Sequence, residues 1–104
     1  MSAQPPVAAD IVVLGKIVGA YGLRGAVHVH PFADDPAAWA RMKYWWLGRE
    51  GEAPERWQPQ RLIRFRAHGD SWVAQFAGVD DRNAAEAATG LLIGAPREAL
   101  PATA

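Results

Sequence analysis

The chain contains no cysteine, which excludes a disulfide scaffold, thiol catalysis and metal sites built on cysteine ligands. It has no excess of charge either, because 11 Lys and Arg residues are matched by 11 Asp and Glu residues. A protein that binds nucleic acid phosphates without specificity needs a clear basic excess, so that class is not expected. The longest apolar runs end at Lys16 and Arg24, far short of the roughly 20 residues of a membrane helix.

Serine is also scarce, since Ser71 is the only serine after Ser2. It follows a turn that carries His68 and Asp70, but residues so close on one hairpin rarely reach the geometry of a catalytic triad. We therefore expect no catalytic residues and a protein that is not an enzyme. The first ten residues have neither a cationic segment nor an apolar core, so no signal peptide is expected.

What the sequence does contain is typical of one small globular domain. It has 104 residues, of which 50% are hydrophobic and 21% charged. Five tryptophans are many for this length, and a small β core needs such large side chains to fill it. An exposed Trp45 or Trp46 would instead be an interface anchor.

Hydrophobic periodicity predicts six short strands and one short helix between two tails. Val27 and Val29 should point inward and His28 and His30 outward, and Gly15 should mark a bulge or bend. Many short strands around one core favour an all-β fold, a small closed six-stranded β-barrel. The expected strands cover residues 10–19, 26–31, 43–47, 57–67, 71–77 and 91–94, and the expected core contains Val27, Val29, Ile63, Phe65, Trp72 and Phe76.

The period changes after residue 77, where a short helix is expected at 84–89. Asn83 and Glu86 have the spacing of a capping box, with Asn83 as the N-cap, and Gly90 should end the helix. A helical turn is also expected after Pro36. Residues 1–9 contain small residues and two prolines, which predicts a disordered tail.

Three glycines spaced three apart, Gly19, Gly22 and Gly25, make the most distinctive segment. They permit positive φ angles and close backbone approach. The spacing does not match a dinucleotide-binding or phosphate-loop fingerprint. The open interpretations are a strained turn and a recognition loop that presents Tyr21 and Arg24.

Other candidate groups each have a structural alternative. Asp34 and Asp35 have the chemistry of acid–base or metal sites, but caps on the following turn are the simpler role. His28 and His30 share a strand face with no third metal ligand in sequence, so no metal site is predicted. Arg64 and Arg66 form a short basic stripe, either a solvated face or a contact for RNA phosphates.

Three segments together resemble one family. Residues 13–36 (VLGKIVGAYGLRGAVHVHPFADDP) look like the opening signature of the RimM family of ribosome maturation factors. Residues 78–90 (GVDDRNAAEAATG) resemble its short helical motif, and residues 96–101 (PREALP) resemble the segment that joins its two domains. The chain departs from the pattern at Tyr21, Ala33 and Ala37, where the family usually has His, Thr and Glu.

The resemblance implies a barrel of the reductase/translation-factor type at 10–95 and the start of an interdomain linker at 96–104. The family also has a second domain, a barrel of the photosynthetic-reaction-centre type, which we expect to be absent from this chain. The function implied is assistance in late assembly of the 30S subunit head and in 16S rRNA processing, in the cytoplasm. The implied partners are the small-subunit precursor, 16S rRNA and small-subunit ribosomal protein nineteen, the last mainly through the second domain, with no membrane and no cofactor. A monomer is expected.

A flavin- or nucleotide-binding barrel of an oxidoreductase is the alternative function, and an autonomous RNA-binding barrel is a third. For the ribosomal function, Arg24 is either a contact or an internal partner of Asp34 or Asp35. The residues expected to contact the ribosome or rRNA are Tyr21, Gly22, Leu23, Arg24, Gly25, Arg64 and Arg66. Those expected to be structural are Asp34, Asp35, Pro36, Asn83, Glu86 and Gly90.

Overall fold

The computed structural model describes residues 10–101, so the expected tail at 1–9 and the last three residues of the expected linker lie outside it. The described chain is mostly β, with six strands and one α-helix, as expected. The strands are β1 (Ile11–Tyr21), β2 (Ala26–Pro31), β3 (Tyr44–Gly48), β4 (Gln58–His68), β5 (Ser71–Phe76) and β6 (Leu92–Pro96). The helix is α1 (Arg82–Ala87), and the short 3₁₀ turns are η1 (Ala37–Arg41), η2 (Pro54–Arg56) and η3 (Arg97–Ala99).

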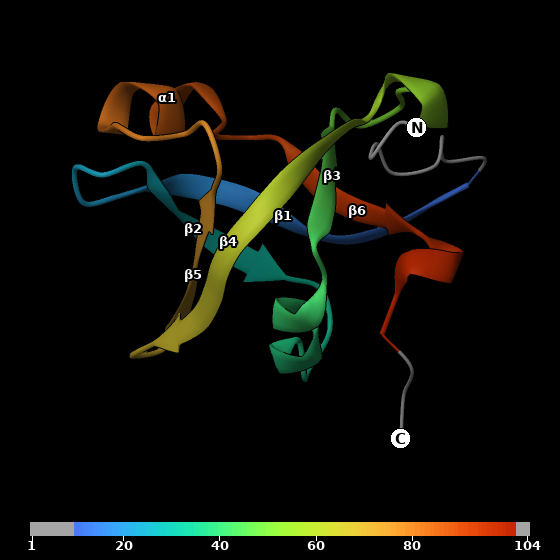
Figure 1. Cartoon of the computed structure of the whole chain (residues 1–104), viewed down its shortest axis with the longest axis horizontal. Helices are drawn as coiled ribbons and strands as arrows, with labels where there is room; N and C mark the ends of the chain where they lie inside the picture. Colours follow the sequence, from blue (N-terminus) through green and yellow to red (C-terminus); the bar gives the residue numbers. More distant parts are fainter. Residues whose placement is uncertain (1–9, 102–104) are drawn as a thin grey trace.

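The six strands form one closed sheet in the order β1-β2-β5-β4-β3-β6, and every neighbouring pair is antiparallel (Figure 1). Because the sheet closes on itself, each of the six strands within residues 10–101 has a neighbouring strand on both sides. In Figure 1, α1 lies at the upper end of the sheet and η1 at the lower end. Helix α1 packs against β1 and β2, and η1 packs against β4.

Strand β1 bends through two irregularities, which lets it pair with β2 on one side and β6 on the other. Its register shifts between Ile17 and Gly19 against β2, and between Val13 and Gly15 against β6. The bulge expected at Gly15 is thus confirmed. A Cβ atom on Gly15 would lie 2.6 Å from the carbonyl oxygen of His30, so only glycine fits this close approach.

The core inside the sheet is built from aromatic side chains. Trp45 is fully buried, and its ring meets the Phe65 ring edge-on with the centroids 4.7 Å apart. Phe65 also stacks on Trp72 at 4.9 Å, and Trp39 from η1 lies beside both Trp45 and Phe65. Burial of Val27, Val29, Phe65 and Phe76 is confirmed, whereas Trp72 is only half-buried. Because Trp45 and Trp46 are buried, neither is an exposed interface anchor.

The prediction that Ile63 belongs to the core is wrong. Its side chain is 55% exposed, and Leu62 is buried instead. The register between β4 and β5 shifts between Leu62 and Arg64, so Ile63 is the extra residue of a β-bulge. A bulge interrupts the alternation of side chains, and Ile63 therefore lies on the outer face with Arg64.

The helix begins earlier than expected, because a different residue caps it. Asp81 is the N-cap, and its carboxylate accepts a 2.8 Å hydrogen bond from the backbone N–H of Ala84. The capping box of Asn83 and Glu86 is therefore wrong; Glu86 instead pairs with Arg82 at 3.4 Å on the helix surface. Gly90 has a φ of +95° after the helix, and its N–H donates to the carbonyl of Ile17.

The helical turn expected after Pro36 is confirmed as η1, and Pro36 is fully buried. Neither Asp34 nor Asp35 caps it, because Pro36 occupies the N-cap and η1 has no side-chain cap. Both carboxylates are exposed. The capping role predicted for this pair is wrong.

Candidate functional site

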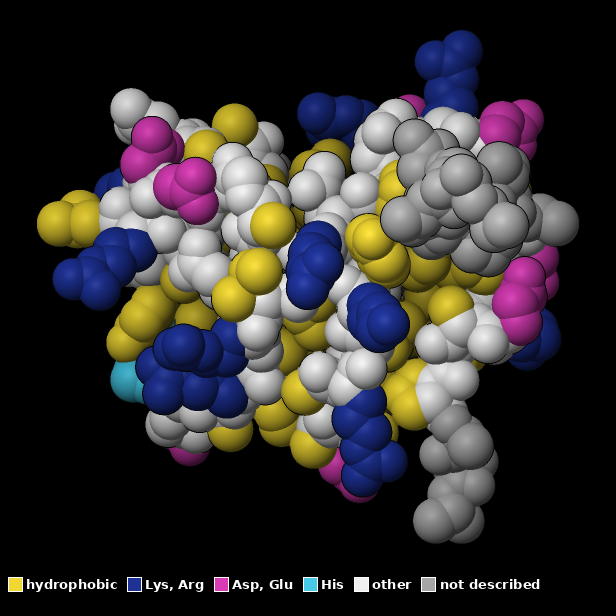
Figure 2. Space-filling view, viewed as in Figure 1, with side chains coloured by type: hydrophobic (Ala, Val, Ile, Leu, Met, Phe, Trp, Pro, Cys, Tyr) yellow, Lys and Arg dark blue, Asp and Glu magenta, His cyan; other side chains and the backbone are white. Residues whose placement is uncertain are grey.

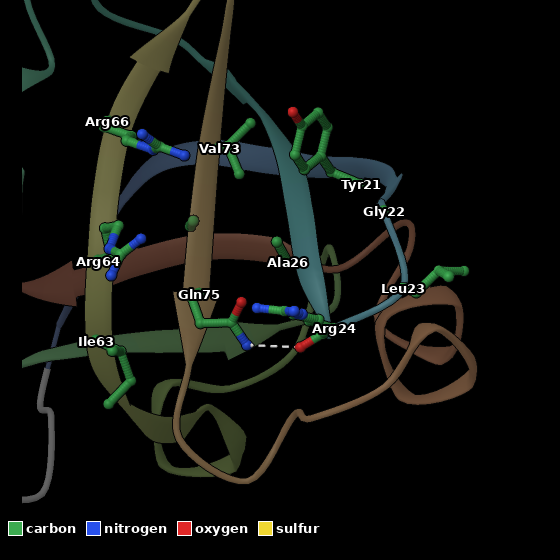
Figure 3. A pocket seen from close by; sticks show the side chains of 11 residues that line it. Tyr21, Gly22, Leu23, Arg24, Ala26, Ile63, Arg64, Arg66, Val73 and Gln75 are labelled. Carbon is green, nitrogen blue, oxygen red and sulfur yellow. Dashed lines mark hydrogen bonds between the residues drawn. The ribbon is translucent and has the colours of Figure 1, made fainter.

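A groove of about 610 Å³ is lined both by the glycine turn and by the basic stripe of Arg64 and Arg66, which the sequence analysis treated as separate candidates. One wall is the turn between β1 and β2, with Tyr21, Gly22, Leu23 and Arg24. The floor and the opposite wall come from β5 and β4 (Figure 3). We call this site the arginine groove, and its other lining residues are Ala26, Ile63, Arg64, Arg66, Val73, Ala74 and Gln75.

The arginine groove has one sign of charge. Arg24, Arg64 and Arg66 are all exposed, and none of the described residues that line the groove is Asp or Glu. Figure 2 shows Lys and Arg side chains across the face that β4 crosses, with Asp and Glu toward the margins of the view. Although the net charge of the chain is zero, its charges are unevenly distributed, and the groove is a local basic surface that attracts an anionic ligand.

The groove also has an apolar component. Leu23 is 77% exposed and Ile63 is 55% exposed, and each lies at the border of the groove. In Figure 3 the Leu23 side chain points away from the arginines, whereas Ile63 follows Arg64 along β4. A ligand that carries both anionic groups and apolar or planar surface matches this combination.

The turn that bears Arg24 is held from three sides. The Tyr21 hydroxyl and His68 Nε2 are 3.0 Å apart and hydrogen-bonded, which ties the end of β1 to the β4–β5 hairpin. Arg82 Nη1 donates to the Gly22 carbonyl at 3.0 Å. Gln75 Nε2 donates to the Arg24 carbonyl at 3.1 Å (Figure 3). These bonds fix the backbone and leave the Arg24 guanidinium exposed to a ligand.

Gly22 and Gly25 give this turn its shape, with φ angles of +70° and +93°. Gly25 is also buried, and a Cβ atom there would lie 2.0 Å from the carbonyl oxygen of Val79. Any other residue at this position would clash with the backbone before α1. The structure thus confirms a turn that needs glycine at these two positions, and the recognition loop weighed from the sequence stays a prediction.

The proposed internal pairing of Arg24 does not occur. The ion pairs among residues 10–101 are Arg82 with Glu86 and Arg97 with Asp10, so neither Asp34 nor Asp35 pairs with Arg24. The residues expected to contact a ligand all line the groove except Gly25, which is buried next to the Val79 carbonyl. That they contact a ligand stays a prediction.

The histidines have structural contacts. His28 meets the Tyr21 ring edge-on at 5.1 Å, and His30 lies near Phe32. Within the part of the chain that the structure describes, no three His, Asp or Glu side chains cluster as metal ligands would. No helix of residues 10–101 has the length and apolar character to cross a membrane.

Sequence reasoning missed Gln75, Arg82 and the outward turn of Ile63. Gln75 and Arg82 act on backbone carbonyls that are 51 and 60 residues away in the chain, so no local pattern indicates them. For Ile63 the sequence did contain a signal. Leu62 and Ile63 are adjacent apolar residues, and this pair interrupts the alternation of apolar and polar residues along β4.

Comparison with known proteins gives a consistent result. The model of the RimM N-terminal domain family matches residues 12–100. The ribosome maturation factor RimM of Aromatoleum aromaticum is 56% identical over 92 residues, which cover 88% of this chain and 55% of that protein. The ribosome maturation factor RimM of Dechloromonas aromatica is 52% identical over 94 residues, which cover 90% and 54%. The chain thus spans about half the length of these curated relatives.

Two solved structures are similar. A crystal structure from Pseudomonas aeruginosa, described as a 16S ribosomal RNA processing protein RimM, aligns with a TM-score of 0.76 and 38% identity, covering 91% of this chain and 56% of that chain. The solution structure of the N-terminal domain of RimM from Thermus thermophilus aligns with a TM-score of 0.65 and 26% identity, covering 88% and 95%.

Proposed function

The chain belongs to the RimM N-terminal domain family, and from this membership we propose that it is the part of a ribosome maturation factor that contacts the small-subunit precursor. The observation that carries the proposal is the arginine groove, in which a braced turn and strand β4 present three guanidinium groups without a carboxylate. Guanidinium groups bind phosphates through paired hydrogen bonds, so the ligand we assign is the 16S rRNA backbone at the precursor's surface.

The wider role follows from the same membership. We propose that the protein assists late assembly of the 30S head and 16S rRNA processing in the cytoplasm, as a monomer without a cofactor. Residues 10–95 form a barrel of the reductase/translation-factor type, and residues 96–104 begin a linker to a second domain of the photosynthetic-reaction-centre type. That second domain provides most of the contact with small-subunit ribosomal protein nineteen.

In this proposal the domain acts by binding and not by catalysis. A flavin- or nucleotide-binding role is not favoured, since the relatives at 50% identity or more are named ribosome maturation factors. Titration with flavin mononucleotide separates the two functions. We expect no saturable change of tryptophan fluorescence, and a saturable change at micromolar ligand would favour the alternative.

The substitution Arg24→Ala tests the proposed contact. Because the Arg24 guanidinium has no ion pair within residues 10–101, the melting temperature should be nearly unchanged. Cosedimentation with immature small subunits should fall, most strongly at low salt. The slope of log affinity against log salt should decrease by about 1 if one phosphate contact is lost.

Arg56→Ala is the matched control, because Arg56 is an exposed arginine of η2 that does not line the groove. This variant should cosediment like the parent. If Arg24→Ala is folded and cosediments as well as Arg56→Ala, the turn does not belong to the contact surface.

A further inference from the structure

Gln75 occupies the place where the backbone pairing of β2 and β5 stops. The last paired residues are Val27 and Ala74, and the glycine turn begins just beyond them. Gln75 is the next residue of β5, and its side-chain amide continues the connection where backbone pairing ends. Nε2 donates to the carbonyl of Arg24 at 3.1 Å and to the carbonyl of Val79 at 2.8 Å.

Both bonds use the same amide group, and they add to the bond from Arg82 to the Gly22 carbonyl and the bond from the Val79 N–H to the Phe76 carbonyl. A primary amide has two N–H donors, so Gln75 satisfies one carbonyl with each. Val79 is also the residue whose carbonyl Gly25 approaches most closely. The side chain of Gln75 therefore joins the turn before β2 to the segment that leads into α1.

Gln75 is at the same time the neighbour of Arg64 across the sheet. The register pairs Gln75 with Arg64, immediately after the bulge at Ile63. In Figure 3 it lies between the turn that bears Arg24 and the strand that bears Arg64 and Arg66, and the Arg24 guanidinium points toward its amide. One uncharged, half-buried side chain thus links the two basic walls of the groove.

We propose that Gln75 is a positioning residue, which holds Arg24 in a fixed relation to Arg64 and Arg66 so that the three guanidinium groups engage one polyanionic strand together. The inference rests on the proposed function of the groove and deepens it. A turn that is ordered before binding loses less conformational entropy when the ligand arrives. Without the amide, Arg24 keeps its charge but must be ordered during binding.

A thermodynamic cycle tests this proposal. The parent, Gln75→Leu, Arg24→Ala and the double variant are labelled and titrated with purified immature small subunits. If Gln75 acts through Arg24, Gln75→Leu should weaken binding about five- to tenfold in the parent and less than about twofold in the Arg24→Ala background. In the Arg66→Ala background, Gln75→Leu should still weaken binding about five- to tenfold. An equal loss in every background would overturn the positioning role.

Gln60→Leu is the matched control for the loss of an amide. Gln60 is half-buried on the same sheet and does not line the groove. It should leave the affinity unchanged. A loss as large as that of Gln75→Leu would mean that the effect comes from the sheet in general.

Hydrogen exchange of the free protein provides a readout that needs no ligand. In Gln75→Leu, the backbone amides of Val27 and His28, which lie where β2 pairs with β1 and β5 beside the turn, should exchange at least about tenfold faster than in the parent, because local opening next to the turn becomes easier. The amides of β3 and β6 should not change. Unchanged exchange at Val27 and His28 overturns the proposal. A different result would separate the two proposals. If exchange is faster in Gln75→Leu but the parent does not bind subunits, Gln75 does hold the turn in place, and the proposed function of the groove is refuted.

Discussion

At the scale of single residues, Leu62 and Ile63 are chemically alike and adjacent, yet one is buried and the other is 55% exposed. The bulge between β4 and β5 causes this difference. It removes an aliphatic side chain from the core and places it beside Arg64, where it adds apolar surface to a basic groove. Bulges near binding sites commonly re-aim a side chain in this way.

Substitution of the two residues should therefore have very different effects on stability. Leu62→Ala should lower the free energy of unfolding by about 2–5 kcal/mol, because it leaves a cavity. Ile63→Ala should cost less than about 1 kcal/mol, the range of strand propensity at exposed positions. Urea denaturation of both variants measures the difference, and equal losses would place Ile63 in the core.

At the scale of elements, the turn between β1 and β2 and the start of α1 depend on each other. Gly25 approaches the carbonyl of Val79, Gln75 bonds to that same carbonyl, and Arg82 in α1 bonds to Gly22. The segment before the helix is thus one support of the turn that presents Arg24. A substitution in the turn should therefore alter the start of α1, and a substitution at the start of α1 should alter the turn.

Gly25→Ala should destabilise the protein more than Gly51→Ala. Both glycines have positive φ angles, but a Cβ on Gly51 meets nothing within 4 Å. Gly51→Ala should therefore show only the conformational cost of about 1–2 kcal/mol. Gly25→Ala adds a clash with Val79 and should also displace Arg24, which weaker subunit binding would reveal. Equal stability losses would contradict the close approach at Gly25.

The cap of α1 gives a second prediction at this scale. Asp81→Ala should cost about 1 kcal/mol, because the N–H of Ala84 loses its side-chain acceptor. Asn83→Ala should be neutral or slightly stabilising, since Asn83 lies inside the helix and alanine is the better helix former. Thermal melts of the two variants measure the difference in stability. A larger loss for Asn83→Ala than for Asp81→Ala would identify Asn83 as the cap.

At the scale of the whole molecule, stability comes from one aromatic core enclosed by the closed sheet. The two ion pairs of residues 10–101 are exposed, and such pairs contribute little. Phe65 is central, because it contacts Trp39, Trp45 and Trp72. Charged side chains are thus left to the surface, where they form the arginine groove.

Phe65→Ala should lower the free energy of unfolding by about 3–5 kcal/mol, since it opens a cavity among three tryptophans. It should also weaken the near-ultraviolet circular dichroism of those rings. Phe32→Ala is the control, because Phe32 is 56% exposed. A Phe65→Ala protein that melts within a degree or two of the parent would show that the core does not depend on this ring.

The sequence by itself determined what depends on near neighbours. Alternation predicted the strand Ala26–Pro31 with its inward valines, and the hairpin turn after His68 and the bulge at Gly15 followed from turn and glycine chemistry. The family resemblance, carried by three short motifs, was confirmed as well. The sequence also indicated both halves of the candidate site, the glycine turn and the β4 arginines, but only as separate groups.

Only the tertiary structure decided how those halves meet. Strand β5 pairs with both β2 and β4, and this closure brings Arg24 to the same groove as Arg64 and Arg66. The bulge at Ile63, the choice of Asp81 over Asn83 as cap and the bonds of Gln75 all depend on register between distant segments. Register is set by the packing of the whole core, and no local pattern contains that information.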